Sequence, residues 1–203
     1  MTAVAERAAV TLRTCRLDAA REGPLDGTER ARAARFVFER DRLRFVRARA
    51  FLRAVLGERL DLDPAMVPIE APDGAKPHVP GAALDFSLSH SGDLMVVALV
   101  ERGRVGVDLE ALARAPATDG LARLCLTDPE RAALRGCPER FLEFWTAKEA
   151  RMKLDGHGMA LDPRAIRLAL SGGRPVGYEG EPEIALERVR AHDGAVCHVA
   201  TRP

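Results

Sequence analysis

The sequence predicts an α+β fold with largely antiparallel sheets, and two observations support this prediction. Long segments rich in strong helix formers occupy residues 28–60 and 138–155. Short apolar segments separated by glycine-containing turns make up much of the remaining chain, for example at residues 94–100. With 203 residues the chain can form one large domain or two small lobes.

The first half is expected to begin with a strand and then a long helical segment. Residues 8–17 alternate enough between apolar and polar side chains to form the strand. Residues 28–60 contain no proline and only Gly57, which predicts one long helix or two abutting helices. Five prolines then make residues 64–80 rich in loops, with room for a short strand near Val67.

Three strands are expected next, at residues 83–88, 94–100 and 105–109. Turn sequences at residues 91–93 and 102–103 separate them. Strands joined by turns this short are typical of an antiparallel meander, so we expect a three-stranded meander here.

The second half is expected to contain the same kinds of element as the first, a long helix and several strands. Thr127 to Glu130 combine a cap residue, an early proline and acids in a first turn, which predicts the start of a helix. The helix expected at residues 138–155 is ended by Gly156. Strands are expected at residues 166–170, 184–189 and 196–200. Each half therefore holds a long helix and about three strands, which hints at a duplicated lobe.

Composition narrows the class of protein. The net charge is only +1, but residues 30–53 hold nine arginines against two acids, a local net charge of +7 that predicts an anionic ligand or partner. Aromatic residues make up 4% of the chain, which leaves little surface for base stacking, so nucleic acid is not the favoured partner.

The N-terminus lacks a signal-peptide core and no apolar segment is long enough to span a membrane. The cysteines show no paired-ligand spacing, so we expect a cytoplasmic protein without disulfides or a zinc site; they are Cys15, Cys125, Cys137 and Cys197.

Two acids end one of the expected strands. Asp108 and Glu110 lie two residues apart, so both carboxylates project from the same face. With no histidine or cysteine beside them they form a set of hard oxygen ligands, which Mg²⁺ prefers. The same pattern also fits a strand that ends in solvated acids.

Lysine is rare in this chain, and its positions are informative. The only lysines are Lys76, Lys148 and Lys153, while arginine supplies the other basic residues. Glu149 and Lys153 are four residues apart on one face of the expected helix. They could complete a metal site and hold a phosphate, or form a surface ion pair worth about 0.3–0.5 kcal/mol. Lys148 lies about a quarter-turn from Glu149, so it orients the helix or meets a partner.

A hydroxyl-rich segment surrounds one histidine. Ser89 and His90 lie at a strand end, before the expected turn, where hydroxyl, imidazole and backbone amide groups could bind phosphate oxygens. A histidine at a turn is also commonly just exposed or hydrogen-bonded.

The order of these motifs along the chain resembles that of the 4′-phosphopantetheinyl transferases of the surfactin-synthetase-activating (Sfp) type. The motifs are Gly74-x-Lys76-Pro77, Phe86-x-Leu88-Ser89-His90-Ser91, Gly106-Val107-Asp108-Leu109-Glu110 and Phe144-Trp145-Thr146-x-Lys148-Glu149-Ala150-x-x-Lys153. The resemblance implies a pseudo-twofold fold with lobes at residues 1–103 and 104–203 and a coenzyme A cleft between them. It also implies transfer of the 4′-phosphopantetheine arm of coenzyme A to a serine of an apo acyl or peptidyl carrier protein, with release of adenosine 3′,5′-bisphosphate.

The resemblance assigns roles to individual residues. By similarity, the acids that would hold Mg²⁺ on the pyrophosphate are Asp108, Glu110 and Glu149. The residues that would bind coenzyme A are Arg32, Arg44, Lys76, Pro77, Ser89, His90, Asp108 and Lys153. Among these, Lys153 would contact the transferring phosphate, and Lys76 with Arg44 the adenylate end. Glu149, directly or through water, is the preferred base for the attacking serine, and a neutral Lys153 is the alternative.

Two other functions remain open from the sequence. One is a different Mg²⁺-dependent phosphotransferase or phosphodiesterase acting on a nucleotide. The other is a module without enzyme activity whose basic helix binds nucleic acid or an acidic protein. The resemblance favours the transferase, as a monomer without a membrane or nucleic-acid partner, serving fatty-acid, polyketide or non-ribosomal peptide biosynthesis.

Overall fold

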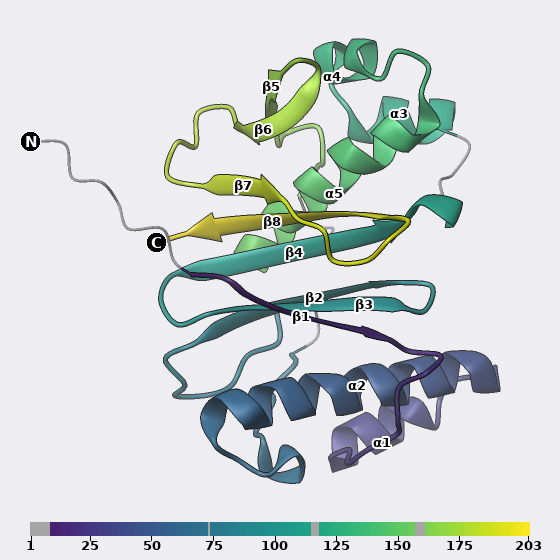
Figure 1. Ribbon diagram of the computed structural model, residues 1–203, viewed down its shortest axis with the longest axis vertical. Helices are drawn as coiled ribbons and strands as arrows, with labels where there is room; N and C mark the ends of the chain where they lie inside the picture. The colour runs from purple at the N-terminus through teal and green to yellow at the C-terminus, as the bar shows by residue number, and fades with distance from the viewer. Residues whose placement is uncertain (1–8, 73, 115–117, 157–160) are drawn as a thin grey trace, which may run out of the picture.

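The computed structural model describes residues 9–72, 74–114, 118–156 and 161–203. Two small lobes are stacked on each other (Figure 1). The first is built from helices α1 and α2 beneath a sheet of strand order β1-β3-β2. The second has a sheet of strand order β4-β8-β7 beneath helix α5, with helices α3 and α4 and the hairpin β5-β6 at its far side. All paired strands of these sheets are antiparallel, which confirms the predicted α+β class.

The helical segment at residues 28–60 is two helices, the second of the predicted alternatives. They are α1 (Gly27–Ala33) and α2 (Glu39–Leu60). Asp26 caps α1 by accepting from the backbone N–H of Glu29 at 2.8 Å, while the Glu29 carboxylate accepts from the Asp26 N–H at 3.0 Å. A buried Arg53 on α2 donates to both acids, at 2.6 Å to Asp26 and 2.7 Å to Glu29, so α1 is fixed against α2.

The strand β3 (Leu94–Val100) is buried on both faces, which explains its uninterrupted apolar sequence. One set of its side chains packs into the core beneath α2; the set is Met95, Val97 and Leu99. The alternate set packs against the second sheet; it is Val96, Ala98 and Val100. The two lobes therefore share a core that passes through β3.

The predicted meander is wrong in its third strand. Strand β2 (Asp85–Ser91) pairs with β3, but β4 (Arg104–Ala111) pairs with β8 (Ala195–Arg202) in the other sheet. Strand β1 (Thr11–Arg16) takes the remaining edge of β3, so no edge of β3 is left for β4. The short strand expected near Val67 is also absent: the structure has a short 3-10 turn, η1 (Pro64–Met66), and one isolated bridge between Glu70 and His78.

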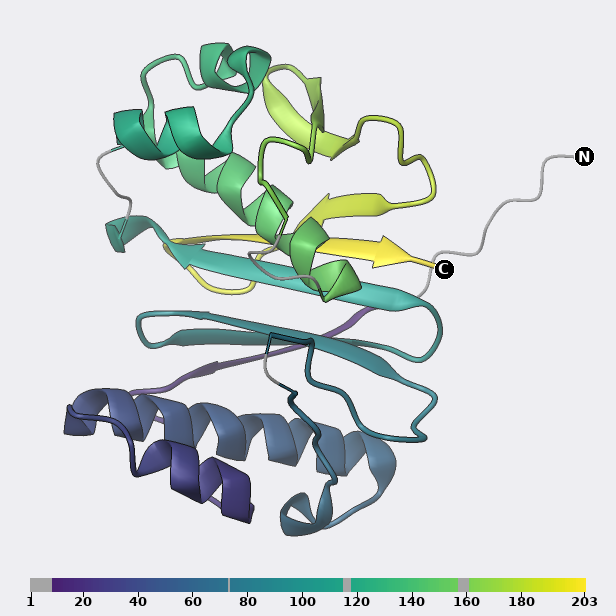
Figure 2. The same cartoon turned by 180° about the vertical axis from the view of Figure 1, so that it is seen from behind.

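In the second lobe α5 (Pro138–Asp155) crosses the sheet, as the view from behind shows (Figure 2). Its C-terminal cap is Gly156 in the left-handed conformation, as predicted. The predicted helix start at Thr127 opens α4 (Asp128–Ala133), and strands β5 (Leu168–Ser171), β7 (Ala185–Arg188) and β8 fall at the predicted places. Three elements were not predicted: η2 (Leu112–Arg114), α3 (Thr118–Cys125) and β6 (Arg174–Tyr178). No helix in the described ranges is both long and apolar enough to cross a membrane.

Candidate functional site

A polar seam joins the two lobes where β2 lies beside β4. The seam is defined here by the side chains of Asp85, Ser87, Ser89 and Ser91 on β2 and by the β4 groups that they contact. Asp85 and Ser87 accept from the backbone N–H groups of Val105 and Val107, at 2.8 and 3.1 Å. Ser89 and Ser91 instead contact acidic side chains of β4. The contacts advance along both strands in the same direction, so β2 and β4 run parallel and are linked through side chains.

The centre of the seam is a triad of contacting side chains. The hydroxyl of Ser89 donates to Oδ1 of Asp108 at 2.7 Å, and the ammonium of Lys153 lies 2.6 Å from the same oxygen. Lys153 also donates to the Ser89 hydroxyl at 3.1 Å. Asp108 and Ser89 are buried, whereas the Lys153 side chain is 27% exposed. The structure thus brings together three of the predicted site residues from three different elements.

One oxygen of this triad has no partner. Oδ2 of Asp108 is buried and accepts no hydrogen bond from any described residue. A buried carboxylate oxygen without a donor is costly, since the desolvation is not repaid. An oxygen of this kind is suited to receive a ligand or a cation.

Two further carboxylates face the same region. Glu110 accepts from the Ser91 hydroxyl at 2.5 Å. Burial raises the pKa of Glu149 above its ordinary value; Lys153 acts in the opposite direction, and the charges of Asp108 and Glu110 raise it further. Lys153, Asp108 and Glu110 therefore all lie within electrostatic range of Glu149. Still, within the ranges that the structure describes, no three His, Cys, Asp or Glu side chains lie close enough together to hold a metal ion.

Helix α5 reaches this site because Gly106 has no side chain. A Cβ at position 106 would lie 2.5 Å from the amide nitrogen of Leu154, and closer still to the carbonyl oxygen of Ala150. Gly106 and Asp108 share a face of β4, so the close approach at Gly106 brings α5 over the carboxylate. The glycine of the predicted motif therefore sets the distance between strand and helix.

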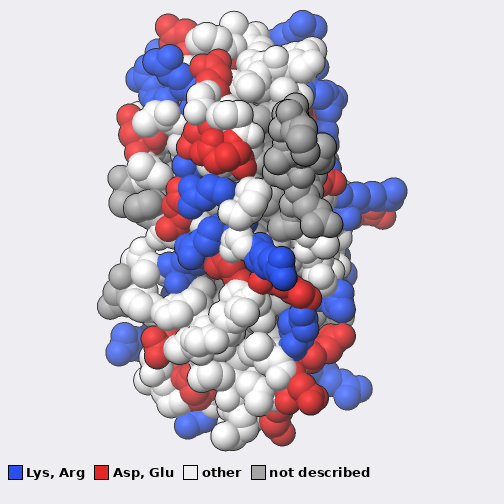
Figure 3. All heavy atoms as spheres, turned by 90° about the vertical axis from the view of Figure 1, so that its left-hand side faces the viewer, with Lys and Arg blue, Asp and Glu red and all other residues white. Residues whose placement is uncertain are grey.

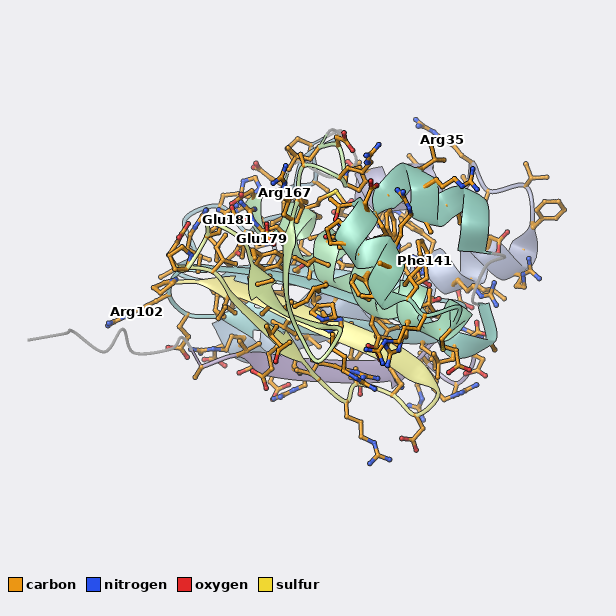
Figure 4. All side chains as sticks on the ribbon, turned by 90° about the horizontal axis from the view of Figure 1, so that it is seen from above. Arg35, Arg102, Phe141, Arg167, Glu179 and Glu181 are labelled. Atoms are coloured by element: carbon orange, nitrogen blue, oxygen red, sulfur yellow. The ribbon has the colours of Figure 1, made fainter. Side chains whose placement is uncertain are left out.

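A pocket of about 940 Å³ adjoins the end of the seam and is lined by both lobes. Its lining includes Ser91 and Glu110, two residues beyond Ser89 and Asp108 on their strands, but no residue of the triad itself. The first lobe contributes the predicted residues Arg32, Arg44 and His90. The second contributes Glu110 of the seam and the aromatic pair Phe141 and Trp145, whose rings stack at 6.3 Å. In the view from above, the labelled Phe141 lies on the opposite side from Arg102 of the β3–β4 turn, so the pocket is at the far end of the seam from that turn (Figure 4).

The two predicted arginines are held differently. Arg44 forms a two-pronged contact with Asp93, at 2.7 and 3.1 Å, and this bonding raises the pKa of Arg44. The guanidinium of Arg32 lies over the ring of Phe45, 5.3 Å from its centre. Asp93 and Phe45 therefore orient the two cations beside the pocket.

The arginine-rich segment is less basic at its surface than its sequence suggests. Several of its arginines contact acids within the chain; they are Arg40, Arg42, Arg44, Arg49 and Arg53. On the face that Figure 3 shows, basic and acidic side chains intermingle over both lobes without a broad field of one sign. The local charge of +7 therefore does not become an extended basic surface on that face.

Lys76 and Pro77 are not brought to the pocket lining. The Lys76 ammonium pairs with Asp85 at the beginning of β2 and donates to the carbonyl oxygen of Val105 at 2.6 Å. Burial lowers the pKa of Lys76, and the Asp85 contact opposes that change. Ser89 lies four residues further along β2, about 13 Å away for an extended strand. Lys76 thus lies at one end of the seam, away from the triad at its centre.

The prediction that Lys148 could meet a partner protein is wrong. Lys148 is fully buried, with its ammonium 2.9 Å from Glu130 of α4. Burial lowers its pKa, and Glu130 opposes that change. The sequence correctly excluded it from the face of Lys153, but an acid eighteen positions earlier gave no sign that it would be the partner.

Two residues of the site were missed from the sequence, Ser91 and Asp93. The signal for Ser91 was present, because serines at positions 87, 89 and 91 share the strand period of two and so one face. No local pattern indicated Asp93, whose partner Arg44 lies far from it in the sequence.

Comparisons with known proteins agree with this geometry. Residues 104–200 match the family model described as the 4′-phosphopantetheinyl transferase superfamily, and residues 20–102 match the one described as 4′-phosphopantetheinyl transferase, N-terminal. The chain is 32% identical to 4′-phosphopantetheinyl transferase HetI of Nostoc sp. over 185 residues, which cover 87% of this chain and 78% of that protein. It is 27% identical to 4′-phosphopantetheinyl transferase ffp of Bacillus subtilis over 152 residues, which cover 71% of this chain and 66% of that protein. A phosphopantetheinyl transferase of Thraustochytrium sp. is 33% identical over 158 residues, 68% of this chain and 54% of its own length.

Proposed function

This chain belongs to the 4′-phosphopantetheinyl transferase superfamily, and we propose that it transfers the 4′-phosphopantetheine arm of coenzyme A to a serine of an apo carrier protein. Transfer of a phosphopantetheine group is the reaction class of the family. The observation that carries the proposal for this chain is the triad of Ser89, Asp108 and Lys153 beside a pocket lined by both lobes. It supplies a cation and a carboxylate beside a space large enough for a nucleotide-sized ligand.

We propose that coenzyme A lies in this pocket with its pyrophosphate toward the triad. Arg32 and Arg44 then face the adenylate end, where guanidinium groups suit phosphate oxygens. His90 lines the pocket with the arginines, and its chain neighbour Ser89 contacts Lys153, so we propose that these two residues face the pyrophosphate. The coenzyme contacts of Lys76 and Pro77 stay predictions, because Lys76 would have to leave Asp85 to make one.

We also propose a Mg²⁺ site formed by Asp108, Glu110 and Glu149. The chemistry of the donor set fits, since all three supply hard carboxylate oxygens and Oδ2 of Asp108 is buried without a partner among the described residues. A bound ion would have to draw the three carboxylates closer together than they lie in the structure. The raised pKa of Glu149, caused by burial and by the two other acids, fits as well, because a cation among them would relieve that repulsion. When bound, Mg²⁺ would offset negative charge on the pyrophosphate.

The chain's own residues account for the rest of the reaction. The serine hydroxyl of the carrier attacks the phosphorus that bears the pantetheine arm, and the bond from that phosphorus to the bridging oxygen breaks. Adenosine 3′,5′-bisphosphate leaves with the bonding electron pair. Glu149 accepts the serine proton, a role for which a carboxylate of raised pKa is suited. Lys153, held by Asp108 and Ser89, stabilises charge on the transferring phosphate.

The test is transfer itself. The purified chain is incubated with coenzyme A, Mg²⁺ and a panel of apo carrier proteins from fatty-acid, polyketide and non-ribosomal peptide synthases, and the carrier masses are measured. We expect one carrier or more to gain a single phosphopantetheine group. No mass gain with any carrier would refute the proposed substrate.

A pair of variants tests the site. Glu149→Ala is expected to abolish transfer while coenzyme A still binds, as measured by calorimetry. Glu181→Gln is the matched control, because Glu181 contacts Arg151, a residue of the same helix as Glu149, but has no part in the proposed metal site. Full activity of Glu149→Ala would refute its role.

We further propose that the chain acts as a monomer, because a single copy supplies both walls of the pocket. Sedimentation of the purified protein measures this directly. Its cytoplasmic location stays a prediction from the scattered cysteines, which are all unpaired thiols in the structure.

A further inference from the structure

We infer that Lys148 is a positioning residue: together with Glu130 it fixes helix α5 so that Glu149 faces Asp108 and Glu110. The inference rests on the proposed function, because it concerns how the proposed metal and base residue is held. It gives a role to the third lysine of the chain, which does not itself line the pocket and whose ammonium bonds to groups outside the triad.

The contacts of Lys148 use its full capacity. An ammonium has three N–H donors. The Lys148 ammonium lies 2.9 Å from Oε2 of Glu130 and donates to the carbonyl oxygens of Pro163 and Ile166 at 2.9 and 2.5 Å. Its side chain is 0% exposed, so these three acceptors define its position without help from solvent.

Both carboxylate oxygens of Glu130 also have hydrogen-bond partners within the chain. Its Oε2 also accepts from the backbone N–H of Thr127 at 2.8 Å, and its Oε1 accepts from that of Leu168 at 3.0 Å. The pair therefore ties α5 to the start of α4, to the loop before β5 and to β5 itself. A fully satisfied buried network of this kind fixes geometry, since any shift leaves a buried polar group without its partner.

Lys148 can affect the site through the helix itself, because it directly precedes Glu149 on α5. Glu149 is the next residue and lies about 100° further round the helix. On its sheet side α5 is seated on Gly106, with no room for it to approach. Gly106 thus limits the depth of the helix, and the Lys148 network limits its rotation. Loss of the network frees the rotation that aims Glu149.

A residue that only stabilised the fold would lower the melting temperature and leave the metal site intact. The two roles are separated by measuring binding of Mn²⁺, as the probe for the proposed site, by electron paramagnetic resonance in the presence of coenzyme A. The variants are Glu130→Gln, which removes the charge from the α4 side, and Lys148→Met, which keeps the length of the side chain. The control is Arg151→Met.

Arg151 is a matched control because it is also on α5 and also forms a partly buried ion-pair network. Its guanidinium contacts Glu181 at 2.5 Å and also Asp155. The labelled Glu181 lies with Glu179 and Arg167, apart from Phe141 of the pocket (Figure 4). Its loss is expected to lower the melting temperature without changing Mn²⁺ affinity.

We expect Glu130→Gln and Lys148→Met each to weaken Mn²⁺ binding about tenfold, the low end of the effect of losing an outer-shell contact. The concentration of Mg²⁺ for half-maximal transfer should rise by a similar factor. Unchanged Mn²⁺ affinity in both folded variants, with only a lower melting temperature, would overturn the inference. If Lys148→Met does not fold, Glu130→Gln alone decides, because it leaves α5 unaltered and keeps an oxygen for the Leu168 N–H. Failure of the wild-type chain to transfer the arm would instead refute the proposed function.

Discussion

The closest contact between strand and helix gives the sharpest prediction. Gly106→Ala adds one methyl group to β4 at the point where α5 crosses it. The added Cβ would lie 2.5 Å from the nitrogen of Leu154 and 3.0 Å from its Cα, both of which are backbone atoms that cannot rotate away. An ordinary contact begins at 3.4 Å, so α5 must move by at least about 0.9 Å.

The size of the effect follows from this displacement. Overpacking of a tight site costs about 1–3 kcal/mol. For a domain of this size that corresponds to a melting temperature lower by about 2–12 °C. Since Lys153 and Glu149 are on the displaced helix and Asp108 is on the strand, the contact of 2.6 Å between Lys153 and Asp108 should lengthen. A misplacement of about 1 Å at a reacting centre can cost 100-fold in rate.

The assay combines calorimetric melting with the rate of carrier modification. Gly120→Ala is the control, because Gly120 lies in α3 and an added Cβ meets nothing within 4 Å. Ala is the better helix former by about 1 kcal/mol, so the control should melt at the same temperature or higher. A Gly106→Ala protein with unaltered melting temperature and rate would refute the seating of α5 on this glycine.

Three further predictions concern the seam, the pocket and pH. Ser89→Ala removes a donor to buried Asp108, so the free energy of unfolding in urea should fall by about 1–3 kcal/mol, and no change would contradict that contact. Arg44→Met should raise the KM for coenzyme A about tenfold or more with kcat unchanged, as expected for loss of a charge-assisted contact, while Arg42→Met on the same helix leaves both constants unaltered. Burial lowers the pKa of His198 from 6.5 to about 4. The neutral imidazole therefore stabilises the fold fully above pH 6.5, and this stabilisation, at most about 3 kcal/mol, is lost as the pH falls from 6.5 to 4. Urea unfolding against pH should show a shallower fall for His198→Gln than for the wild type, and parallel curves would contradict this assignment.

The sequence predicted those parts of the site that depend on local periodicity. Asp108 and Glu110 share a face because strand side chains alternate, and Lys153 lies one helical turn after Glu149. That these groups would meet across two elements followed only from the resemblance, because periodicity says nothing about which strand a helix crosses. The contact of Lys153 with Asp108 depends on Gly106, whose role is visible only once the helix lies over it.

The failures have a common cause in long-range pairing. The predicted meander needed an unoccupied edge on β3, and a strand from the beginning of the chain takes that edge. The basic segment predicted an anionic ligand or partner, but acids distant in the sequence pair with several of its arginines, such as Asp93 with Arg44 and Glu29 with Arg49. Lys148 could be excluded from the face of Lys153 by helix geometry, yet its burial depends on Glu130 of another helix. In each case the sequence predicted the local element correctly, but the distant residue or strand that pairs with it could not be read from the local pattern.

The seam explains why the site lies between the lobes and not within either of them. A sheet continued from β2 to β4 would satisfy both edges by a backbone ladder and would leave no reason for polar side chains there. Here side chains of β2, and not its backbone, form the hydrogen bonds to β4. At Ser89 and Ser91 their partners are carboxylates instead of backbone groups. Asp108 can thus be buried at the junction with hydroxyl and ammonium partners, and Glu110 can be partly buried against a hydroxyl. Oδ2 of Asp108 still lacks a partner within the described part of the chain. Since Ser89 comes from one lobe and Asp108 and Lys153 from the other, separation of the lobes would dismantle the triad, so the proposed reaction requires both lobes in contact.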